Sequence, residues 1–328
     1  MSDDPPDDPE PVTPHRGHPG HTEFRAQMRA TRADFEHQVQ MRRAQIDATN
    51  ERITARTGRN LILAILIGVG LGLVTLFSLI VVKELFVLFA MVVSGFAAFE
   101  FSGALRASGR RVPRIPSTVA AVLLIPLAYY ADAQGAWLAV LGAIIALSIW
   151  RLVEQFFDRF RTSPTALWRD LRSTALVQVY VPFLASFAVV LVHQDEGQWW
   201  ALAFLVLVIA VDTGAYASGL SFGKHPMVPS ISPKKTWEGF AGAALVSIIA
   251  GILLATLMLH QPWWFGPILG ATILASATIG DLSESLIKRD LGIKDMSSWL
   301  PGHGGFLDRV DSILPSALAA YALFLIFA

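Results

Sequence analysis

The stretch WWALAFLVLVIAVDTGAYASGL, residues 199–220, decides the fold class of this chain. It is apolar and long enough to cross a bilayer, since a membrane-spanning α-helix needs about 20 residues. Its one charged residue is Asp212, near the C-terminal end. An ionised group at membrane depth costs at least about 2.5–3.5 kcal/mol, so Asp212 needs a basic partner, a watery cavity or a metal ion. The stretch therefore predicts a membrane helix with a candidate functional acid, a simple ion pair at the helix end being the alternative.

The composition of the whole chain agrees with a membrane protein. Of its 328 residues, 53% are hydrophobic and only 16% are charged, whereas soluble domains carry about a quarter charged residues. There is no cysteine, which excludes disulfides, thiolate zinc sites and cysteine nucleophiles. The net charge is zero, so the overall balance gives no indication of a nucleic-acid partner. We expect an all-α, polytopic integral membrane protein.

Several further stretches resemble residues 199–220 in length and hydropathy. The predicted membrane segments are 61–82, 85–104, 116–131, 135–153, 173–192, 199–220, 239–259, 263–285 and 308–327. The loops after the second, fourth, sixth and eighth segments are rich in Lys and Arg, and the intervening loops are poor in them. Cytoplasmic loops carry such an excess of basic residues. We therefore expect about nine transmembrane helices, a cytoplasmic N-terminus and a C-terminus outside.

The first part of the chain differs from the rest. Residues 1–20 are rich in Pro, Asp, Glu and His, and residues 21–58 are rich in arginine and sparsely apolar. Such a composition cannot bury a core. We expect residues 1–58 to form a cytoplasmic extension that is either disordered or weakly helical, followed by a membrane-embedded domain at 59–328.

Carboxylates recur near the predicted cytoplasmic ends of the last two segments. Asp281, Ser285 and Lys288 are spaced i, i+4 and i+7, so one helix face carries all three. Asp308 and Asp311 are spaced i, i+3 at the start of the last segment. Each has an ordinary alternative, such as an interfacial lysine that extends to water or a first-turn acid that suits the helix dipole. Their shared faces favour a functional site.

Two other segments predict sites for anions. Ser232 and Pro233 suit the N-cap and first positions of a helix, which puts Lys234 and Lys235 in its first turn. The helix dipole disfavours cations there, so a bound anion explains them better, with ordinary cytoplasmic charge as the alternative. The second segment, PGHGG at 301–305, has three glycines whose backbone N–H groups can face an anion, with a flexible turn as the alternative.

Together these elements predict a site for phosphates and a hard divalent cation. Mg²⁺ binds one or two carboxylates plus substrate phosphate oxygens, and carboxylates from separate segments could hold two metal ions. No P-loop motif occurs in the sequence. For His303 the residues alone leave a structural role and a ligand-contacting role open.

The chain resembles the CDP-diacylglycerol synthase family, the phosphatidate cytidylyltransferases, in its bacterial form. The resemblance is carried by Ser285, by Lys288-Arg289 and by the stretch KDMSSWLPGHGGFLDRVD at 294–311, which together match the C-terminal signature of the family. Three shorter blocks, DTGAY at 212–216, SPKKTWEG at 232–239 and GDLSES at 280–285, also match. The likeness covers about residues 60–328.

The resemblance implies that CTP and phosphatidic acid react to give CDP-diacylglycerol and pyrophosphate, a step of phospholipid biosynthesis. It implies a multi-pass protein of the bacterial inner membrane, with a polar cavity that faces the cytoplasm. It further implies Mg²⁺, bound by Asp281 and Asp308 with Asp311 close by, and K⁺ as a second cation. Dimers are common in the family. The catalytic residues expected on this basis are Asp281, Ser285, Lys288, Asp308 and Asp311, and those that bind substrate are Asp212, Ser232, Lys234, Lys235, His303, Gly304, Gly305 and Arg309.

Three rival interpretations can be weighed. A secondary transporter would also keep carboxylates in the membrane, but here the polar residues gather at one face and the sequence has no internal repeat. The CDP-alcohol phosphotransferases need a D-G-x2-A-R…G-x3-D-x3-D pattern that is absent. A catalytically dead relative is disfavoured because the signature is complete.

Overall fold

The computed structural model describes residues 61–297, 299 and 304–328. The chain divides into two units, Met1–Ile62 and Leu63–Ala328. The second unit contains every element described below, apart from the first two residues of its first helix. The predicted extension at 1–58 and His303 lie outside the described residues.

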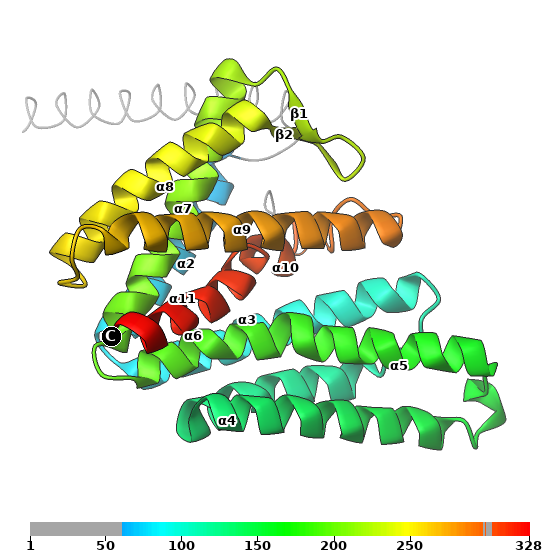
Figure 1. The fold of residues 1–328 in the computed structure, drawn as a ribbon. Helices are drawn as coiled ribbons and strands as arrows, with labels where there is room; N and C mark the ends of the chain where they lie inside the picture. Colours follow the sequence, from blue (N-terminus) through cyan, green and yellow to red (C-terminus); the bar gives the residue numbers. More distant parts are fainter. Residues whose placement is uncertain (1–60, 298, 300–303) are drawn as a thin grey trace, which may run out of the picture. The chain divides into compact units, whose positions relative to one another are not determined.

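The second unit is built from α-helices, as predicted (Figure 1). The longer helices are α2 Leu61–Ile80, α3 Lys83–Ala107, α4 Arg114–Glu154, α5 Pro164–Gln178, α6 Leu184–His193, α7 Gly197–Phe222, α8 Trp237–Leu257, α9 Phe265–Asp290 and α11 Ile313–Phe327. The short elements are the 3₁₀ turn η1 Asp158–Phe160, the π-helical turn η2 Val179–Phe183, the one-turn helix α10 Leu307–Val310, and the strands β1 Pro226–Val228 and β2 Ser232–Thr236.

In the described residues, seven helices are long and apolar enough to cross a membrane. One is α4, whose backbone leaves helical geometry at Ala131 and Asp132. The helical stretches on either side of this kink correspond to the third and fourth predicted segments. A shorter apolar helix at Gly68–Ile80 falls within the first predicted segment. The fold class is therefore confirmed, whereas the count of nine transmembrane helices stays a prediction.

The fifth predicted segment begins too late in the chain. The helical stretch runs from Pro164 to His193 through α5, η2 and α6. Ser163 is the N-cap of α5 and accepts a hydrogen bond from the Ala166 backbone N–H at 3.3 Å, with Pro164 in the first turn. These start signals lie in a polar stretch, so a search for apolar residues alone misses them.

The residues around Ser232 form a strand, so the predicted helix start at Ser232–Pro233 is wrong. Strand β2 pairs antiparallel with β1, with Ser232 opposite Val228. The N-cap of α8 is Thr236, whose hydroxyl accepts a hydrogen bond from the Gly239 N–H at 3.1 Å. Both Ser and Thr suit an N-cap, and the strand pairing decides between them. Lys234 and Lys235 therefore precede the helix, so the predicted position of two cations in its first turn is wrong.

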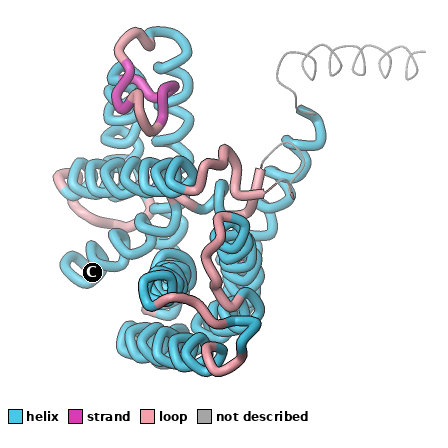
Figure 2. The backbone as a smooth tube through the Cα atoms, turned by 90° about the vertical axis from the view of Figure 1, so that its right-hand side faces the viewer, coloured by secondary structure: helices cyan, strands magenta, loops and turns pink. Residues whose placement is uncertain are grey.

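The hairpin lies beyond the ends of α7 and α8 and beside α9 (Figures 1 and 2). Arg289 of α9 donates a hydrogen bond to the Ile231 carbonyl at 3.2 Å. Helices α7 and α8 pack tightly because small residues face each other. A Cβ on Gly242 would lie 1.8 Å from the Ser218 hydroxyl oxygen, and a Cβ on Gly239 would lie 2.9 Å from the Ala215 carbonyl oxygen. This packing fixes the hairpin relative to Asp212.

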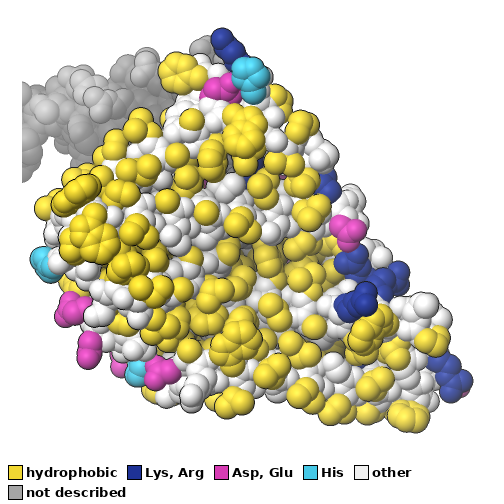
Figure 3. All heavy atoms as spheres, viewed as in Figure 1, with side chains coloured by type: hydrophobic (Ala, Val, Ile, Leu, Met, Phe, Trp, Pro, Cys, Tyr) yellow, Lys and Arg dark blue, Asp and Glu magenta, His cyan; other side chains and the backbone are white. Residues whose placement is uncertain are grey.

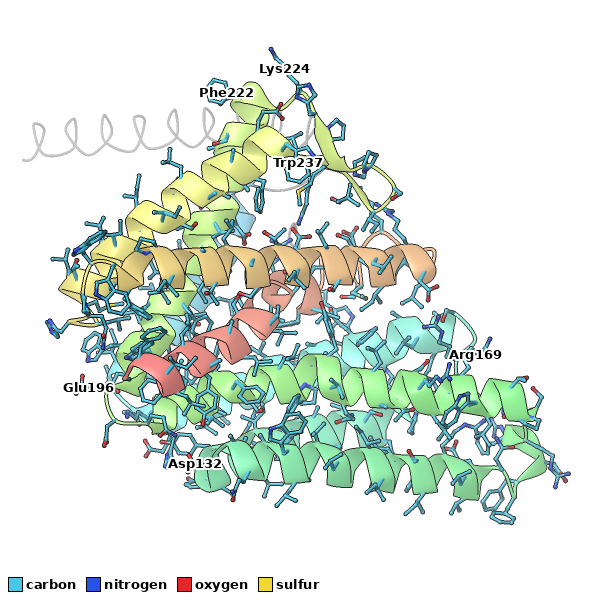
Figure 4. The ribbon with its side chains drawn as sticks, in the orientation of Figure 1. Asp132, Arg169, Glu196, Phe222, Lys224 and Trp237 are labelled. Atoms are coloured by element: carbon cyan, nitrogen blue, oxygen red, sulfur yellow. The ribbon has the colours of Figure 1, made fainter. Side chains whose placement is uncertain are left out.

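The surface and interior of the unit are both largely apolar. Large side chains such as Leu138, Leu257 and Ile326 are at least 70% exposed, and hydrophobic atoms cover most of the face in Figure 3. Such a surface is typical of a protein surrounded by lipid. Basic side chains gather along one edge of Figure 3. Figure 4 places Arg169 at that end and Asp132 and Glu196 at the opposite end.

Candidate active site

A polar cavity of about 430 Å³ lies between α7, α8, α9, α10 and the hairpin. Binding sites for small ligands have volumes of roughly 300–1,000 Å³. The charged residues that line the cavity are Asp212, Lys234, Lys235, Asp281, Glu284, Lys288, Asp295, Asp308, Arg309 and Asp311. The described lining thus holds six carboxylates and four cations. Most of the residues that the sequence predicted as a site meet in this one cavity.

Asp281 and Lys235 join α9 to the hairpin across the cavity. Their Oδ2 and Nζ atoms are 2.5 Å apart, and both side chains are partly exposed to the cavity. Ser285 lies one turn after Asp281, and its hydroxyl approaches Asp281 Oδ1 at 3.4 Å. Ser285 lies outside the described lining of the cavity, and its catalytic role stays a prediction.

Lys288 lies two turns after Asp281 in α9 and bridges two buried acids. Its Nζ lies 2.7 Å from Glu284 Oε2 and 2.8 Å from Asp308 Oδ1. Glu284 is only 1% exposed, and its Oε1 has no hydrogen-bond partner among the described groups. Glu284 Oε1 is therefore a buried oxygen atom that can accept a hydrogen bond or bind a cation.

Asp308 organises the loop that precedes it. Its Oδ2 accepts hydrogen bonds from the backbone N–H of Gly305 at 2.8 Å and of Met296 at 3.1 Å. Gly304 adopts a φ of +78°, the left-handed conformation expected of a glycine there. The Gly305 N–H that the sequence assigned to a bound anion is thus used by a carboxylate of the chain.

Asp311 lies where the last helix meets α9. A Cβ on Gly280 would lie 2.3 Å from the Asp311 carbonyl oxygen, so only glycine permits this approach. The Tyr180 hydroxyl donates a hydrogen bond to the Gly280 carbonyl at 3.3 Å. The close approach brings Asp311 to the same cavity as Asp281, one residue after Gly280.

The remaining predicted residues differ in position. Asp212 and Lys234 are exposed in the cavity lining, and Arg309 also lines it. Ser232 lies at the first position of β2, outside the lining.

Glu100 is a buried acid that the sequence reasoning missed. It lies in α3 and is 2% exposed. Its carboxylate accepts hydrogen bonds from the Ser297 hydroxyl and from the Leu307 N–H, the latter at 3.0 Å. A Cβ on Gly305 would clash with it at 2.6 Å. Glu100 therefore holds both ends of the loop that carries Gly304 and Gly305, and an acid inside an apolar segment was the available signal.

The donor set of the cavity fits a hard divalent cation. Carboxylate oxygens are ligands that Mg²⁺ accepts, and a carboxylate offers about four acceptor positions. Asp281 uses two of these and Asp308 three in the contacts above, while Glu284 Oε1 uses none. No group of three side chains that could hold a metal ion is assembled among the described residues.

Comparison with known proteins identifies the family. Residues 62–327 match the family described as the cytidylyltransferase family. The chain belongs to this family. It is 41% identical over 273 residues to a phosphatidate cytidylyltransferase of Mycobacterium bovis, which covers 82% of this chain and 89% of the relative.

Two further relatives carry the same name. A phosphatidate cytidylyltransferase of Mycobacterium leprae is 37% identical over 278 residues, covering 82% of this chain and 89% of the relative. One of Brucella suis is 32% identical over 200 residues, covering 59% and 73%. Membership confirms the predicted resemblance and an enzyme of the nucleotidyltransferase class, and it disfavours the transporter interpretation.

Proposed function

We propose that this protein is a phosphatidate cytidylyltransferase, which transfers CMP from CTP to phosphatidic acid and releases pyrophosphate. The observation that carries this is the polar cavity, where acids and lysines meet inside an otherwise apolar helical unit. A soluble triphosphate needs a charged, hydrated site, while a lipid phosphate must reach that site without its chains leaving the membrane. The family of the chain supports the same conclusion.

The chemistry requires orientation and charge more than proton transfer. A phosphate oxygen of phosphatidic acid attacks the α-phosphorus of CTP, and the bond from that phosphorus to the β-phosphate oxygen breaks. The attacking phosphate is already anionic near pH 7, so no strong base is needed. Lys234, Lys235, Lys288 and Arg309 are the cations that can orient these phosphates.

A cation is also part of the proposal, because acids outnumber basic residues in the described lining. A triphosphate that enters the cavity lies near several carboxylates, whose negative charge disfavours its approach. Asp281 and Asp308 would hold Mg²⁺, with Glu284 Oε1 and Asp311 available beside them. When bound, Mg²⁺ supplies positive charge that neutralises the triphosphate oxygens. A second cation, K⁺, stays an expectation drawn from the resemblance.

The same proposal sets the location of the protein. We propose a multi-pass protein of the bacterial plasma membrane whose cytoplasmic side is the end rich in Lys and Arg (Figure 3). The substrates meet at that side, since CTP is in the cytoplasm. Association into a homodimer stays an expectation of the resemblance.

The test is product formation by the purified protein. Incubation with CTP labelled at the α-phosphate, phosphatidic acid and Mg²⁺ should move label into the lipid phase. The same protein in sealed vesicles should show no coupled ion flux. Label that stays in the aqueous phase would contradict the proposal, and flux without product would favour a transporter.

A further inference from the structure

A second cavity, of about 400 Å³, lies against the polar one but has the opposite character. It is bounded by α2, α3, α6, α7, α10 and α11, and apolar side chains make up almost all of its lining. Phe86, Val93, Ala185, Leu205, Ile209 and Val310 are among them. We call it the apolar groove.

Arg309 connects the groove to the active site. It lines both cavities, and it is the one charged residue among the described residues that line the groove. Helix α7 makes the same connection, because Ile209 lines the groove and Asp212, three residues later on the same face, lines the polar cavity. A molecule that is apolar along its length and anionic at one end would match both regions.

Phe306 forms part of the same junction. It lines the groove and stacks on Phe96 of α3, with ring centroids 4.8 Å apart and planes at 11°. It lies in the loop that Glu100 holds at Leu307. The loop that places Asp308 in the polar cavity therefore also places Phe306 in the lining of the groove.

We infer that the apolar groove receives one acyl chain of phosphatidic acid while the phosphate of that lipid lies at Arg309. This inference rests on the proposed function. A chain that enters the groove from the bilayer gains little hydrophobic free energy, because it leaves surroundings that are equally apolar. The groove therefore serves to place the phosphate for attack, an effect on kcat/KM through orientation rather than a large gain in affinity.

Two substitutions that fill the groove with a larger side chain, one from each of two helices, test the inference. Ile209→Trp and Ala90→Trp each place a large ring in it, from α7 and α3. Ile209 is 64% exposed, so its replacement should leave the fold intact. The matched control is Val92→Trp, an exposed position of α3 outside the lining.

The readout compares two phosphatidic acids in detergent micelles, one with oleoyl chains and one with hexanoyl chains. We expect both groove variants to lose about tenfold in kcat/KM for the oleoyl lipid, a change of about 1.4 kcal/mol. The KM for CTP and the rate with the hexanoyl lipid should stay within about twofold of the wild type, since a short chain does not fill the groove. The control should resemble the wild type with both lipids.

The outcomes separate this inference from the proposed function. If the wild type forms no lipid product at all, the proposed function fails. If the wild type is active and the groove variants keep full activity on the oleoyl lipid, the acyl-chain site is wrong and the proposed function stands. The same holds if the variants lose activity equally on the oleoyl and hexanoyl lipids.

Discussion

Two ion pairs of this protein join the same kinds of charge but differ in burial and in how many hydrogen bonds surround them. Arg151 and Asp170 are both almost fully buried, and Asp170 Oδ2 lies 3.0 Å from Arg151 Nη2. Asp170 Oδ1 also accepts the Arg111 N–H at 2.9 Å, and Arg151 donates to the Thr162 hydroxyl and the Phe160 carbonyl. Lys235 and Asp281 instead face an open cavity and remain partly exposed.

We interpret the first pair as one that stabilises the fold and the second as part of a site that binds a ligand. A pair that is closed off from water and hydrogen-bonded on both sides offers no open face to a ligand, and breaking it is strongly destabilising. In the cavity, Asp281 keeps acceptor capacity and Glu284 Oε1 has no described partner. We therefore expect changes at the first pair to alter stability and changes at the second to alter activity.

The largest expected effect is on activity, in Asp281→Asn. Loss of the carboxylate removes a proposed cation ligand, and we expect a fall in CTP-dependent product of at least about 100-fold, of the order seen when a catalytic electrostatic group is removed. The unfolding temperature should not fall. The matched control is Asp290→Asn in the same helix, where the acid pairs with Arg110 outside the cavity. Activity of Asp281→Asn within tenfold of the wild type would remove it from the site.

The largest expected effect on stability is in Asp170→Ala. It removes the closer of the two carboxylates beside the buried Arg151 guanidinium and leaves only Glu154, 3.5 Å from Nη1. Breaking a buried pair costs about 3–5 kcal/mol. Thermal unfolding in detergent measures this, and the activity per folded molecule should be kept. Asp158→Ala at the exposed Arg161–Asp158 pair is the control and should change the free energy of unfolding by about 0–1 kcal/mol. Equal stability of the two variants would refute the distinction.

Glu100→Gln should have an intermediate effect on activity. It weakens the hydrogen bonds to Ser297 and Leu307, and bonds to charged groups contribute about 1.5–3 kcal/mol. We expect kcat/KM to fall about tenfold and hydrogen exchange of the Leu307 amide to become faster. Glu84→Gln, at an exposed position of α3, should change neither quantity. Reduced activity with unchanged exchange at Leu307 would contradict a positioning role.

The smallest expected effect is in Lys234→Ala. Lys234 lines the cavity but is exposed, so its charge is screened by water and ions. We expect the KM for CTP or for the lipid to rise about threefold to tenfold with little change in kcat. Lys224→Ala, at an exposed position two residues after the end of α7 (Figure 4), is the control. If Lys234→Ala matches the wild type in both constants, the residue does not contact substrate.

The sequence predicted the composition of the site better than its local structure. The spacing of Asp281 and Lys288 follows directly from helix periodicity, so one cavity lined by both was predictable. The strand at Ser232–Thr236 was not, because a Ser-Pro pair suits a helix start and the competing hydrogen bonds come from β1. Strand pairing depends on a partner that local signals do not reveal.

Long-range contacts explain the other differences. The loop glycine Gly305 was expected to face an external anion, but Asp308 and Glu100 occupy its surroundings. The Glu100 contacts span about 200 positions in the chain, with a separation of 207 to Leu307. The acid within an apolar segment marks Glu100 itself, but not the partners that it binds. The pairing of Lys235 with Asp281 likewise depends on how the hairpin lies beside α9.

The measurement that tests the central claim most directly is the thermal stability of the wild type with CTP, with and without Mg²⁺. A ligand present at 100 times its Kd stabilises the folded state by about 2.7 kcal/mol. Because acids outnumber basic residues in the described lining of the cavity, CTP should raise the unfolding temperature only when Mg²⁺ is present, and Asp281→Asn should abolish that rise. An equal rise with CTP and a chelator, or an undiminished rise in Asp281→Asn, would contradict the claim that these carboxylates bind the cation that accompanies the triphosphate.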